Sequence, residues 1–442
     1  MNALCLLAWA LAVPDWDLRI VEMYVCDKAG VKQTYALGEG PVYLCVKVAG
    51  EGSGSGVYEL DVEFAGRKHR YTDRRPPRGT ESYILTLGLA AHGAMPYRAE
   101  VDPDQKLDKK RGNNIAEGVL NPTTPVESEW FAPREYDIVD HWEGELVSGT
   151  PEKLVVATPI FGSMSHQTVE SWTKDASSAI EYVAPDRAPA LTLRLADVAK
   201  PVSLEQKAHV VVRNYRVNPA ALNVPWAAYD SLPYDVRSWL TQTGSEEGIE
   251  ALAKFYEATF PVSPREGSSP LAATVKAYMA TLTALEYQAD GHGALMPTLR
   301  DGVARCEGYA ELYVGLVRKM GIPARIVNGY VADEGEGPKA PKDAHSWVEV
   351  WFPGVGWVPQ DPTFADTAAD GATYPCFFYV MPSLNERVAV SYGVNYRLEE
   401  GAEGYGLIGP SHWMAYKGAA PKLKTARTLT IETVPSRKTG PQ

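Results

Sequence analysis

Short stretches in which apolar and polar residues alternate dominate the first half of the chain, and clusters of Gly, Ser and Pro separate them. A period of two is that of a β-strand with one face buried. Regular short strands with such turns between them are typical of β-sandwiches. The first module, at 15–122, is therefore predicted to be a sandwich, with strands at 18–26, 42–48, 57–64, 82–87 and 97–101.

A second β-rich stretch follows at 123–225. Strands are predicted there at 154–161, 190–195 and 208–215, the last with a clean alternating pattern. We expect a second small sandwich that leads into the next domain. Near the end of the chain, residues 429–434 again have a strand pattern, so 391–442 is predicted to be a closing β segment with a polar tail.

From about residue 230 the hydrophobic period changes from two to 3.6, which indicates helices. Ser269 followed by Pro270 marks the start of one of them, because Ser caps helices and Pro suits the first helical position. Another helix is predicted at 246–259, and its buried face would consist of Ile249, Leu252, Phe255 and Tyr256. These residues are most simply core residues.

A third helix is predicted to begin at Cys306. Gly321 stands at its end and Pro323 just beyond, which are the usual stop signals. A helix N-terminus carries about half a positive charge and unpaired amides, so a thiolate there is stabilised and its pKa can fall below the ~8.5 of a free Cys. The same amides can hold a developing oxyanion. The alternative is a structural thiol, because free Cys is among the most buried residue types.

The sequence after this helix predicts a buried strand at 324–331 and then a β-hairpin. Its first strand, 344–352, alternates, and its second, 357–360, ends at Asp361. Folding the hairpin about the Pro-Gly turn between them places His345 opposite Asp361.

A carboxylate beside an imidazole fixes its tautomer and stabilises its protonated form. If the imidazole of His345 also faces Cys306, the three residues form a complete set of nucleophile, general base and orienting acid. Taken singly, His345 would be a satisfied core histidine and Asp361 a turn residue before Pro362.

Composition and charge exclude several classes of protein. The 442 residues are 45% hydrophobic and 22% charged, which argues against disorder. The net charge of −12 argues against a nucleic-acid partner, because phosphate binding needs a basic surface. An apolar run at 4–12 ends in small residues and predicts a signal peptide at 1–13, the alternative being a buried first strand. No run reaches the ~20 apolar residues of a membrane span. We expect a protein that is secreted, periplasmic or on the cell surface.

The cysteine and acidic residues do not indicate a metal site or a cofactor, so none is predicted. Cys26 and Cys45 lie in neighbouring predicted strands and are either a disulfide or two separate buried thiols. The Cys spacings do not suggest zinc. Asp102 and Asp104 could be calcium ligands, but Asp more often caps turns through local backbone bonds.

Four sequence blocks in a fixed order resemble the transglutaminase-like superfamily of papain-like cysteine enzymes, over about 230–385. They are Arg305-Cys306-Glu307-Gly308-Tyr309-Ala310-Glu311-Leu312, Gly321-Ile322-Pro323-Ala324-Arg325-Ile326-Val327-Asn328-Gly329-Tyr330, Ala344-His345-Ser346-Trp347-Val348-Glu349-Val350 and Gly356-Trp357-Val358-Pro359-Gln360-Asp361-Pro362-Thr363. Upstream, the segment 100–106 followed by 112–114 resembles the end of bacterial Ig-like adhesion modules of the CARDB type.

The resemblance implies an α+β papain-like core at 226–390. It assigns the nucleophile to Cys306, the general base to His345 and the orienting acid to Asp361. Arg305 and Ser346 depart from the pattern, which usually has a small or acidic residue and an Ala there. The upstream oxyanion-hole side chain is not identified, although Tyr287 and Gln288 lie in the right region. The calcium-site acidic clusters of animal transglutaminases are not recognisable.

The sequence thus predicts β-sandwich modules followed by an α+β catalytic domain. The expected function is that of an exported cysteine acyl-transfer enzyme, which acts on protein or peptide amides through a thioester. Peptidase or amidase activity is expected ahead of cross-linking. The alternative is a catalytically silent surface protein that binds partners in the transglutaminase-like groove. The face that carries Trp347 and Trp351 could line the substrate cleft, although core packing is expected for at least one of them.

Overall fold

The computed structural model of the chain describes residues 15–53, 56–64, 67–86, 91, 94–108, 112–176, 180–183, 190–194, 202–333, 335–367, 377–393 and 413–435. They form two compact units that divide between Thr124 and Pro125. The predicted signal peptide at 1–13 lies outside the described residues. No helix in the described ranges is long and apolar enough to cross a membrane.

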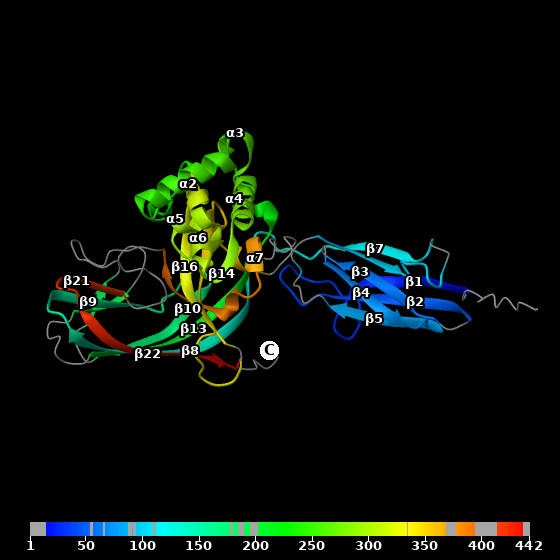
Figure 1. Cartoon of the computed structure of the whole chain (residues 1–442), viewed down its shortest axis with the longest axis horizontal. Helices are drawn as coiled ribbons and strands as arrows, with labels where there is room; N and C mark the ends of the chain where they lie inside the picture. Colours follow the sequence, from blue (N-terminus) through cyan, green and yellow to red (C-terminus); the bar gives the residue numbers. More distant parts are fainter. Residues whose placement is uncertain are drawn as a thin grey trace, which may run out of the picture. The chain divides into compact units, whose positions relative to one another are not determined.

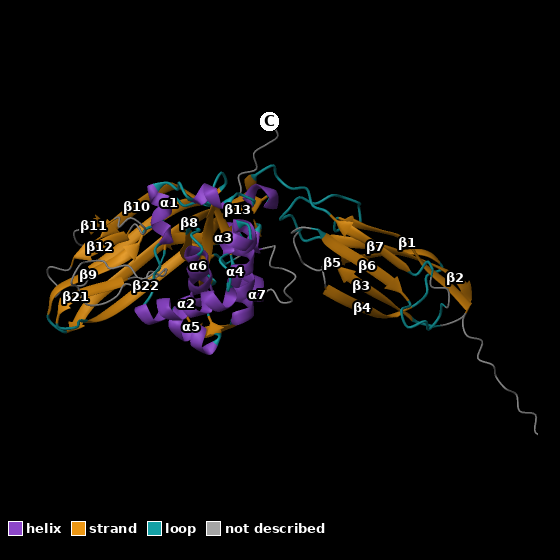
Figure 2. Cartoon of the chain, turned by 90° about the horizontal axis from the view of Figure 1, so that it is seen from above, coloured by secondary structure: helices purple, strands orange, loops and turns teal. Residues whose placement is uncertain are grey.

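The N-terminal unit is a sandwich of two antiparallel sheets (Figures 1 and 2). One has the order β1-β2-β5 and the other β4-β3-β6-β7. Apolar side chains from both sheets form its core, among them Leu18 and Val46 from the first and Leu60 and Val101 from the second. The strands are β1 (Asp15–Cys26), β2 (Tyr43–Ser53), β3 (Tyr58–Phe64), β4 (Arg67–Arg74), β5 (Gly79–Thr86), β6 (Met95–Val101) and β7 (Ile115–Leu120).

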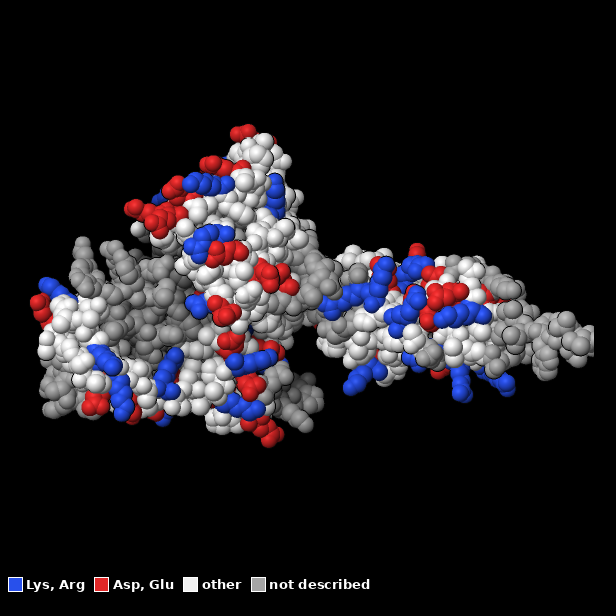
Figure 3. Space-filling model, viewed as in Figure 1, with Lys and Arg blue, Asp and Glu red and all other residues white. Residues whose placement is uncertain are grey.

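The structure shows how two groups that the sequence left ambiguous are arranged in this unit. Cys26 and Cys45 are buried free thiols on the paired strands β1 and β2, not a disulfide. Asp102 caps a turn, because its carboxylate accepts hydrogen bonds from the backbone amides of Lys106, Leu107 and Asp108 at 2.7–3.0 Å. On the face of the molecule drawn in Figure 3, acidic and basic side chains lie intermixed over this unit.

The second unit contains two further antiparallel β-sheets from its first hundred residues and its last strands. One has the order β10-β13-β8-β22, with β19 also paired to β13, and the other β11-β12-β9-β21. Their strands are β8 (Ser128–Ser148), β9 (Pro151–Pro159), β10 (Gln167–Ala176), β11 (Ile180–Val183), β12 (Ala190–Arg194), β13 (Val202–Val217), β19 (Val380–Met381), β21 (Trp413–Gly418) and β22 (Lys422–Val434).

The α+β part of this unit has a four-stranded antiparallel sheet of order β18-β17-β16-β20. It is here called the catalytic sheet because its strand β17 carries His345 of the predicted triad. A short parallel pair, β14 with β15, packs against α5 and α6. The strands are β14 (Glu286–His292), β15 (Val303–Ala304), β16 (Ala324–Val331), β17 (Asp343–Phe352), β18 (Gly356–Gln360) and β20 (Arg387–Tyr392). The helices are α1 (Tyr234–Arg237), α2 (Glu246–Thr259), α3 (Pro264–Gly267), α4 (Pro270–Ala284), α5 (Leu295–Asp301), α6 (Cys306–Lys319) and α7 (Pro362–Thr367), with 3-10 turns η1 (Pro219–Leu222), η2 (Trp226–Tyr229), η3 (Ser238–Leu240) and η4 (Leu384–Glu386).

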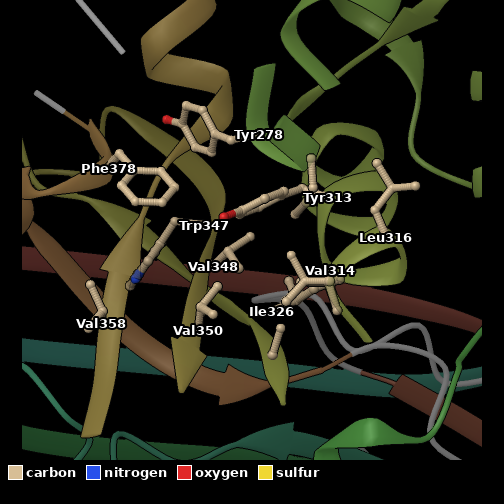
Figure 4. Close-up of a cluster of buried hydrophobic side chains, with 14 of the residues drawn as sticks. Tyr278, Tyr313, Val314, Leu316, Ile326, Trp347, Val348, Val350, Val358 and Phe378 are labelled. Atoms are coloured by element: carbon tan, nitrogen blue, oxygen red, sulfur yellow. The ribbon is translucent and has the colours of Figure 1, made fainter. Parts of the chain in front are cut away.

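Helices cover one face of the catalytic sheet. Tyr313, Val314 and Leu316 of α6 pack against Val348 and other apolar residues of the strands (Figure 4). Caps fix where the neighbouring helices begin: the Ser245 hydroxyl accepts a hydrogen bond from Gly248 N at the start of α2, and the Ser269 hydroxyl does so from Ala272 N at the start of α4. α6 ends at a residue with φ +87°, Gly321, a conformation that favours glycine.

The long β10-β13-β8-β22 sheet covers the opposite face of the catalytic sheet. Tyr330 of β16 and Val388 of β20 share a buried cluster with Ile138 of β8, Val210 of β13 and Ile431 of β22. Apolar residues on both faces explain why the catalytic strands are buried almost throughout.

This packing changes the predicted domain organisation. The sequence predicts three successive segments at 123–225, 226–390 and 391–442, but the described residues of all three lie in one compact unit from Pro125 onward. β22 of the last segment pairs along β8 of the first, and β19 pairs with β13. The catalytic sheet would otherwise expose an apolar face to water, so the β-rich segments are part of its fold and not a separate spacer.

Candidate active site

Cys306 is the first residue of α6, as the sequence predicts. The preceding Arg305 is extended, with φ −94° and ψ −177°, and its side chain makes no capping hydrogen bond. Gly308 lets the first turn approach its neighbours closely, since a Cβ there would stand 2.6 Å from the carbonyl oxygen of His292. The first turn of α6 therefore packs closely against β14 and β15, and Cys306 is partly exposed.

The hairpin that carries the other two candidates has a register two residues away from the predicted one. Phe352 pairs with Gly356 and Val348 with Gln360, because the turn between the strands holds three residues. Continued beyond the last pair, this register sets Asp361 opposite Trp347, and His345 lies on the diagonal. Diagonal neighbours on one face of a sheet are still within reach of long side chains.

His345 and Asp361 meet across that diagonal. Nε2 of His345 donates a hydrogen bond of 2.7 Å to Oδ2 of Asp361. The carboxylate is fully buried and the imidazole is only 5% exposed. Nδ1, the other ring nitrogen, has no hydrogen-bond partner among the described residues. The pair therefore fixes the tautomer that leaves a lone pair on Nδ1.

The sulfur of Cys306 reaches the strand that carries the imidazole. The backbone amide of Ser346, the residue after His345, interacts with it, as does the charge of Asp361. The thiol donates a hydrogen bond of 3.2 Å to Oε2 of Glu307. The three predicted residues are thus gathered at the junction of α6, β17 and the end of β18.

The resting state of the thiol differs from the sequence expectation. Burial and the carboxylate of Glu307 raise the pKa of Cys306 far above its ordinary value, and the charge of Asp361 acts in the same direction. The interaction with the Ser346 amide lowers the pKa but does not outweigh them. These surroundings favour the neutral thiol over the thiolate, so a base is needed to take the proton of Cys306.

Arg387 is a member of the site that sequence reasoning missed. Its Nη1 lies 2.6 Å from Oδ2 of Asp361, the oxygen that also accepts from His345. Its side chain is 1% exposed. Arg387 stands 26 residues beyond Asp361, on the far edge strand of the catalytic sheet, and no local pattern links the two. The signal available in the sequence was a lone Arg among apolar residues of a buried strand.

The predicted cleft residues divide between core and surface. Trp347 is fully buried, so it is a core residue, whereas Trp351 is half-buried and packs edge to face against Trp357 at 5.4 Å. Tyr287 interacts electrostatically with the Cys306 thiol, because β14 carries it beside β15. Gln288 is exposed. Of the two oxyanion-hole suggestions, Tyr287 is the residue near the sulfur.

In the parts of the chain that the structure describes, no three His, Cys, Asp or Glu side chains are grouped to hold a metal ion. The chemistry of this arrangement is that of a thiol, an imidazole base and a buried carboxylate.

Comparison with known proteins finds relatives of the region that carries the site. The sequence profile of the Transglutaminase-like superfamily matches residues 263–362. A protein-glutamine gamma-glutamyltransferase of Pseudomonas aeruginosa is 39% identical over 82 residues, which are 17% of this chain and 12% of that protein. The chain spans only about a tenth of the length of the curated relatives it matches.

Among solved structures, a candidate cysteine protease of Cytophaga hutchinsonii aligns over 70% of this chain and 100% of that one, with 14% identity and a TM-score of 0.44. A CARDB domain from Pyrococcus furiosus aligns over 26% of this chain and 96% of its own, with 16% identity and a TM-score of 0.21. The profile match contains the start of α6 and the whole β17–β18 hairpin. This chain therefore contains a domain of the transglutaminase-like superfamily, at residues 263–362.

Proposed function

We propose that the protein is a cysteine acyl-transfer enzyme, in which Cys306, His345 and Asp361 form the catalytic triad and the substrates are protein or peptide amides. The observation that carries the proposal is the buried bond of 2.7 Å between His345 Nε2 and Asp361 Oδ2. The bond leaves Nδ1 as the proton acceptor of the imidazole, and the amide of the next residue, Ser346, interacts with the thiol.

The reaction would begin with transfer of the thiol proton from Sγ to Nδ1 of His345. The thiolate then attacks the carbonyl carbon, and the C–N bond breaks as the leaving amine takes the proton from Nδ1. The thioester is resolved by water, which gives an acid, or by an amine, which gives a new amide. The oxyanion would be stabilised by backbone amides at the start of α6 and by the hydroxyl of Tyr287, which interacts electrostatically with the thiol.

The compartment and the order of activities are part of the same proposal. We propose that the enzyme acts outside the cytoplasm, on proteins of the cell surface or its surroundings. Hydrolysis as a peptidase or amidase comes first and cross-linking second. Both use one acyl-enzyme and differ only in the second nucleophile.

Covalent labelling tests the nucleophile. The full chain is incubated with an electrophilic glutamine analogue and digested, and the mass of each cysteine-containing peptide is measured by mass spectrometry. Label on the Cys306 peptide is expected, and none on the peptides of the buried Cys26 and Cys45, which serve as internal controls. His345→Gln should abolish labelling at neutral pH. Label that persists in Cys306→Ala would refute the assignment.

A paired assay separates the two outcomes of the thioester. One half of a sample receives a dansylated amine and a glutamine-rich protein, and the other half receives peptide substrates. Cleavage that exceeds amine incorporation would establish hydrolysis, and incorporation without cleavage would establish transamidation. Cys306→Ser and Cys306→Ala samples, prepared identically, report any contaminating activity.

One observation favours a second candidate, a catalytically silent binding protein. The thiol is held by Glu307 and its pKa lies above the ordinary value, which would suit a groove without chemistry. The pH dependence of alkylation distinguishes the two. A triad gives rapid reaction of Cys306 with iodoacetamide below pH 8, whereas a silent groove gives the slow, steep profile of a buried thiol.

A further inference from the structure

Arg387 is a charged side chain buried at the centre of the second unit. It belongs to β20, and its Nη1 lies 2.6 Å from Oδ2 of Asp361. Nη2 lies 3.5 Å from Oγ of Ser383, and the guanidinium is 4.5 Å from the ring centroid of Phe364. A buried guanidinium without a carboxylate partner is strongly unfavourable, so each side chain of this pair requires the other.

The carboxylate of Asp361 is held by donors from three directions. Oδ2 accepts from both His345 and Arg387, and Oδ1 accepts from the backbone amide of Phe364 at 3.0 Å. Three charge-assisted hydrogen bonds leave the carboxylate little freedom to rotate. The position of Oδ2, and through it the orientation of the imidazole, depends on Arg387.

The charges of the site also depend on Arg387. A buried carboxylate with only an imidazole beside it binds one proton jointly with that imidazole, since an isolated buried anion is unfavourable. The imidazole would then be an imidazolium at rest and could not accept the thiol proton. A guanidinium is always charged, so it balances Asp361 without using a titrating proton.

We propose that Arg387 is a positioning residue that supplies the counter-charge of Asp361, so that His345 rests as a neutral imidazole with Nδ1 free to take the proton of Cys306. After that transfer, the charges alternate along the site: thiolate, imidazolium, carboxylate, guanidinium. The total is zero, which suits a buried site. The role of Arg387 in catalysis rests on the proposed function, whereas its effect on the protonation state of His345 does not.

The surroundings of the pair agree with this role. Burial alone would raise the pKa of Asp361, but the neighbouring His345 and Arg387 outweigh it and hold the pKa below its usual range. Other titratable groups nearby include Cys306 of α6 with its neighbour Glu307, Tyr278 of α4, whose hydroxyl donates to the Asp361 backbone carbonyl, and His166, whose Nε2 donates to the Arg387 carbonyl. Glu349 acts on His166. Burial lowers the pKa of His166 to about 4, so it is neutral and gives Asp361 no second counter-charge.

Nuclear magnetic resonance of labelled histidine tests the proposal without any turnover. In the full chain carrying Cys306→Ala, the ring of His345 is assigned by comparison with the same chain carrying His345→Gln. At pH 7 the ring is expected to be neutral with its proton on Nε2. An imidazolium at pH 7 would overturn the proposal, and so would a proton on Nδ1. This measurement uses a chain without the nucleophile and requires no reaction. Its outcome is therefore independent of the labelling experiment on the wild-type chain.

Variants of Arg387 add a second, quantitative measurement. In the Cys306→Ala chain, Arg387→Met should move the titration midpoint of His345 upward by on the order of 1–3 pH units. Arg387→Lys, which keeps the charge, should restore most of the original midpoint. Arg427→Met removes another largely buried Arg–Asp pair, that with Asp140, and should leave the midpoint unchanged. An equal midpoint in Arg387→Met and its parent would overturn the proposal.

The pH dependence of activity distinguishes a positioning role of Arg387 from a purely structural one. With Cys306 intact, Arg387→Met should lose about tenfold more activity at pH 6 than at pH 8, because protonated His345 cannot accept the thiol proton. A uniform loss at every pH would show a purely structural role and refute the inference. If Arg387→Met does not fold, the ring state measured in the Cys306→Ala chain still decides the question.

Discussion

The thiol of Cys306 donates its hydrogen bond to the carboxylate of the residue beside it, Glu307, over 3.2 Å. The same oxygen, Oε2, lies 3.0 Å from Nε of Arg305, so the carboxylate is held between the thiol and a cation. A proton shared with an anion is harder to remove. The contact keeps the nucleophile protonated until the base acts or Glu307 moves away.

Glu307→Gln should make the thiol more reactive. Removing the negative charge lowers the pKa of Cys306, so at a fixed pH below that pKa the thiolate fraction rises. We expect alkylation by iodoacetamide at pH 7 to be roughly three- to tenfold faster than in wild type. Glu247→Gln, at an acid in the first turn of α2, is the matched control and should change nothing. A slower reaction in Glu307→Gln would show that the carboxylate assists the thiol.

Asp361→Asn should damage both activity and stability. Activity is expected to fall by roughly 10³–10⁴, because the amide no longer fixes the imidazole tautomer. The substitution also leaves the guanidinium of Arg387 buried without its carboxylate, which costs roughly 3–5 kcal/mol. Urea unfolding measures the second effect.

The double variant Asp361→Asn with Arg387→Met provides the control for the stability term. Removing both charges should be less destabilising than Asp361→Asn alone, because no unpaired charge remains. A double variant that is less stable than the single one would argue against a charge origin. Activity stays low in both.

His166 should make the second unit sensitive to mild acid. Burial lowers its pKa to about 4, whereas the unfolded chain has the ordinary 6.5, so between these values only the unfolded state binds the proton. Stability is therefore fully present above pH 6.5 and falls as the pH decreases toward 4, by up to about 3 kcal/mol. Urea unfolding between pH 7 and pH 4.5 measures this loss.

His166→Gln keeps a donor for the carbonyl of Arg387 but cannot take up the proton. Its unfolding free energy should depend less on pH over the same interval. His141→Gln removes an exposed histidine of β8 and should retain the wild-type dependence. Identical slopes in His166→Gln and wild type would contradict the assignment.

Ile431→Ala should destabilise the whole second unit. Ile431 of β22 is 2% exposed and packs beside Tyr330 and Val388 of the catalytic sheet. Truncation leaves a cavity and is expected to cost about 2–5 kcal/mol. Thermal unfolding monitored through the tryptophans of the catalytic sheet measures it. Val126→Ala, at a position 90% exposed in the same unit, should stay within about 0.5 kcal/mol of wild type.

Local signals account for the elements that the sequence predicted well. α2, α4 and α6 start at Glu246, Pro270 and Cys306, as the sequence predicts, because caps and the 3.6 period act within a few residues. β16 runs from Ala324 to Val331 as expected. The candidate triad was found because its members stand next to such boundaries.

Long-range contacts account for what the sequence did not reveal. β8 is the centre of the long sheet, yet its charged, alternating pattern was not recognised as one strand of 21 residues. The pairing of Asp361 with Arg387 joins opposite edges of the catalytic sheet and has no local signature. The hairpin register is set by a turn of three residues. This register differs from the predicted register by a single hydrogen-bonding step.

The partnership of β8 with β22 sets an order of events during protein synthesis. Ser148 and Lys422 are register partners far apart in the sequence, so β8 lacks this neighbour until β22 has been translated. Until then the nascent catalytic sheet lacks part of the cover that Leu429 and Ile431 provide. Cys306 at the start of α6 is therefore translated well before β22 completes the packing around the catalytic sheet.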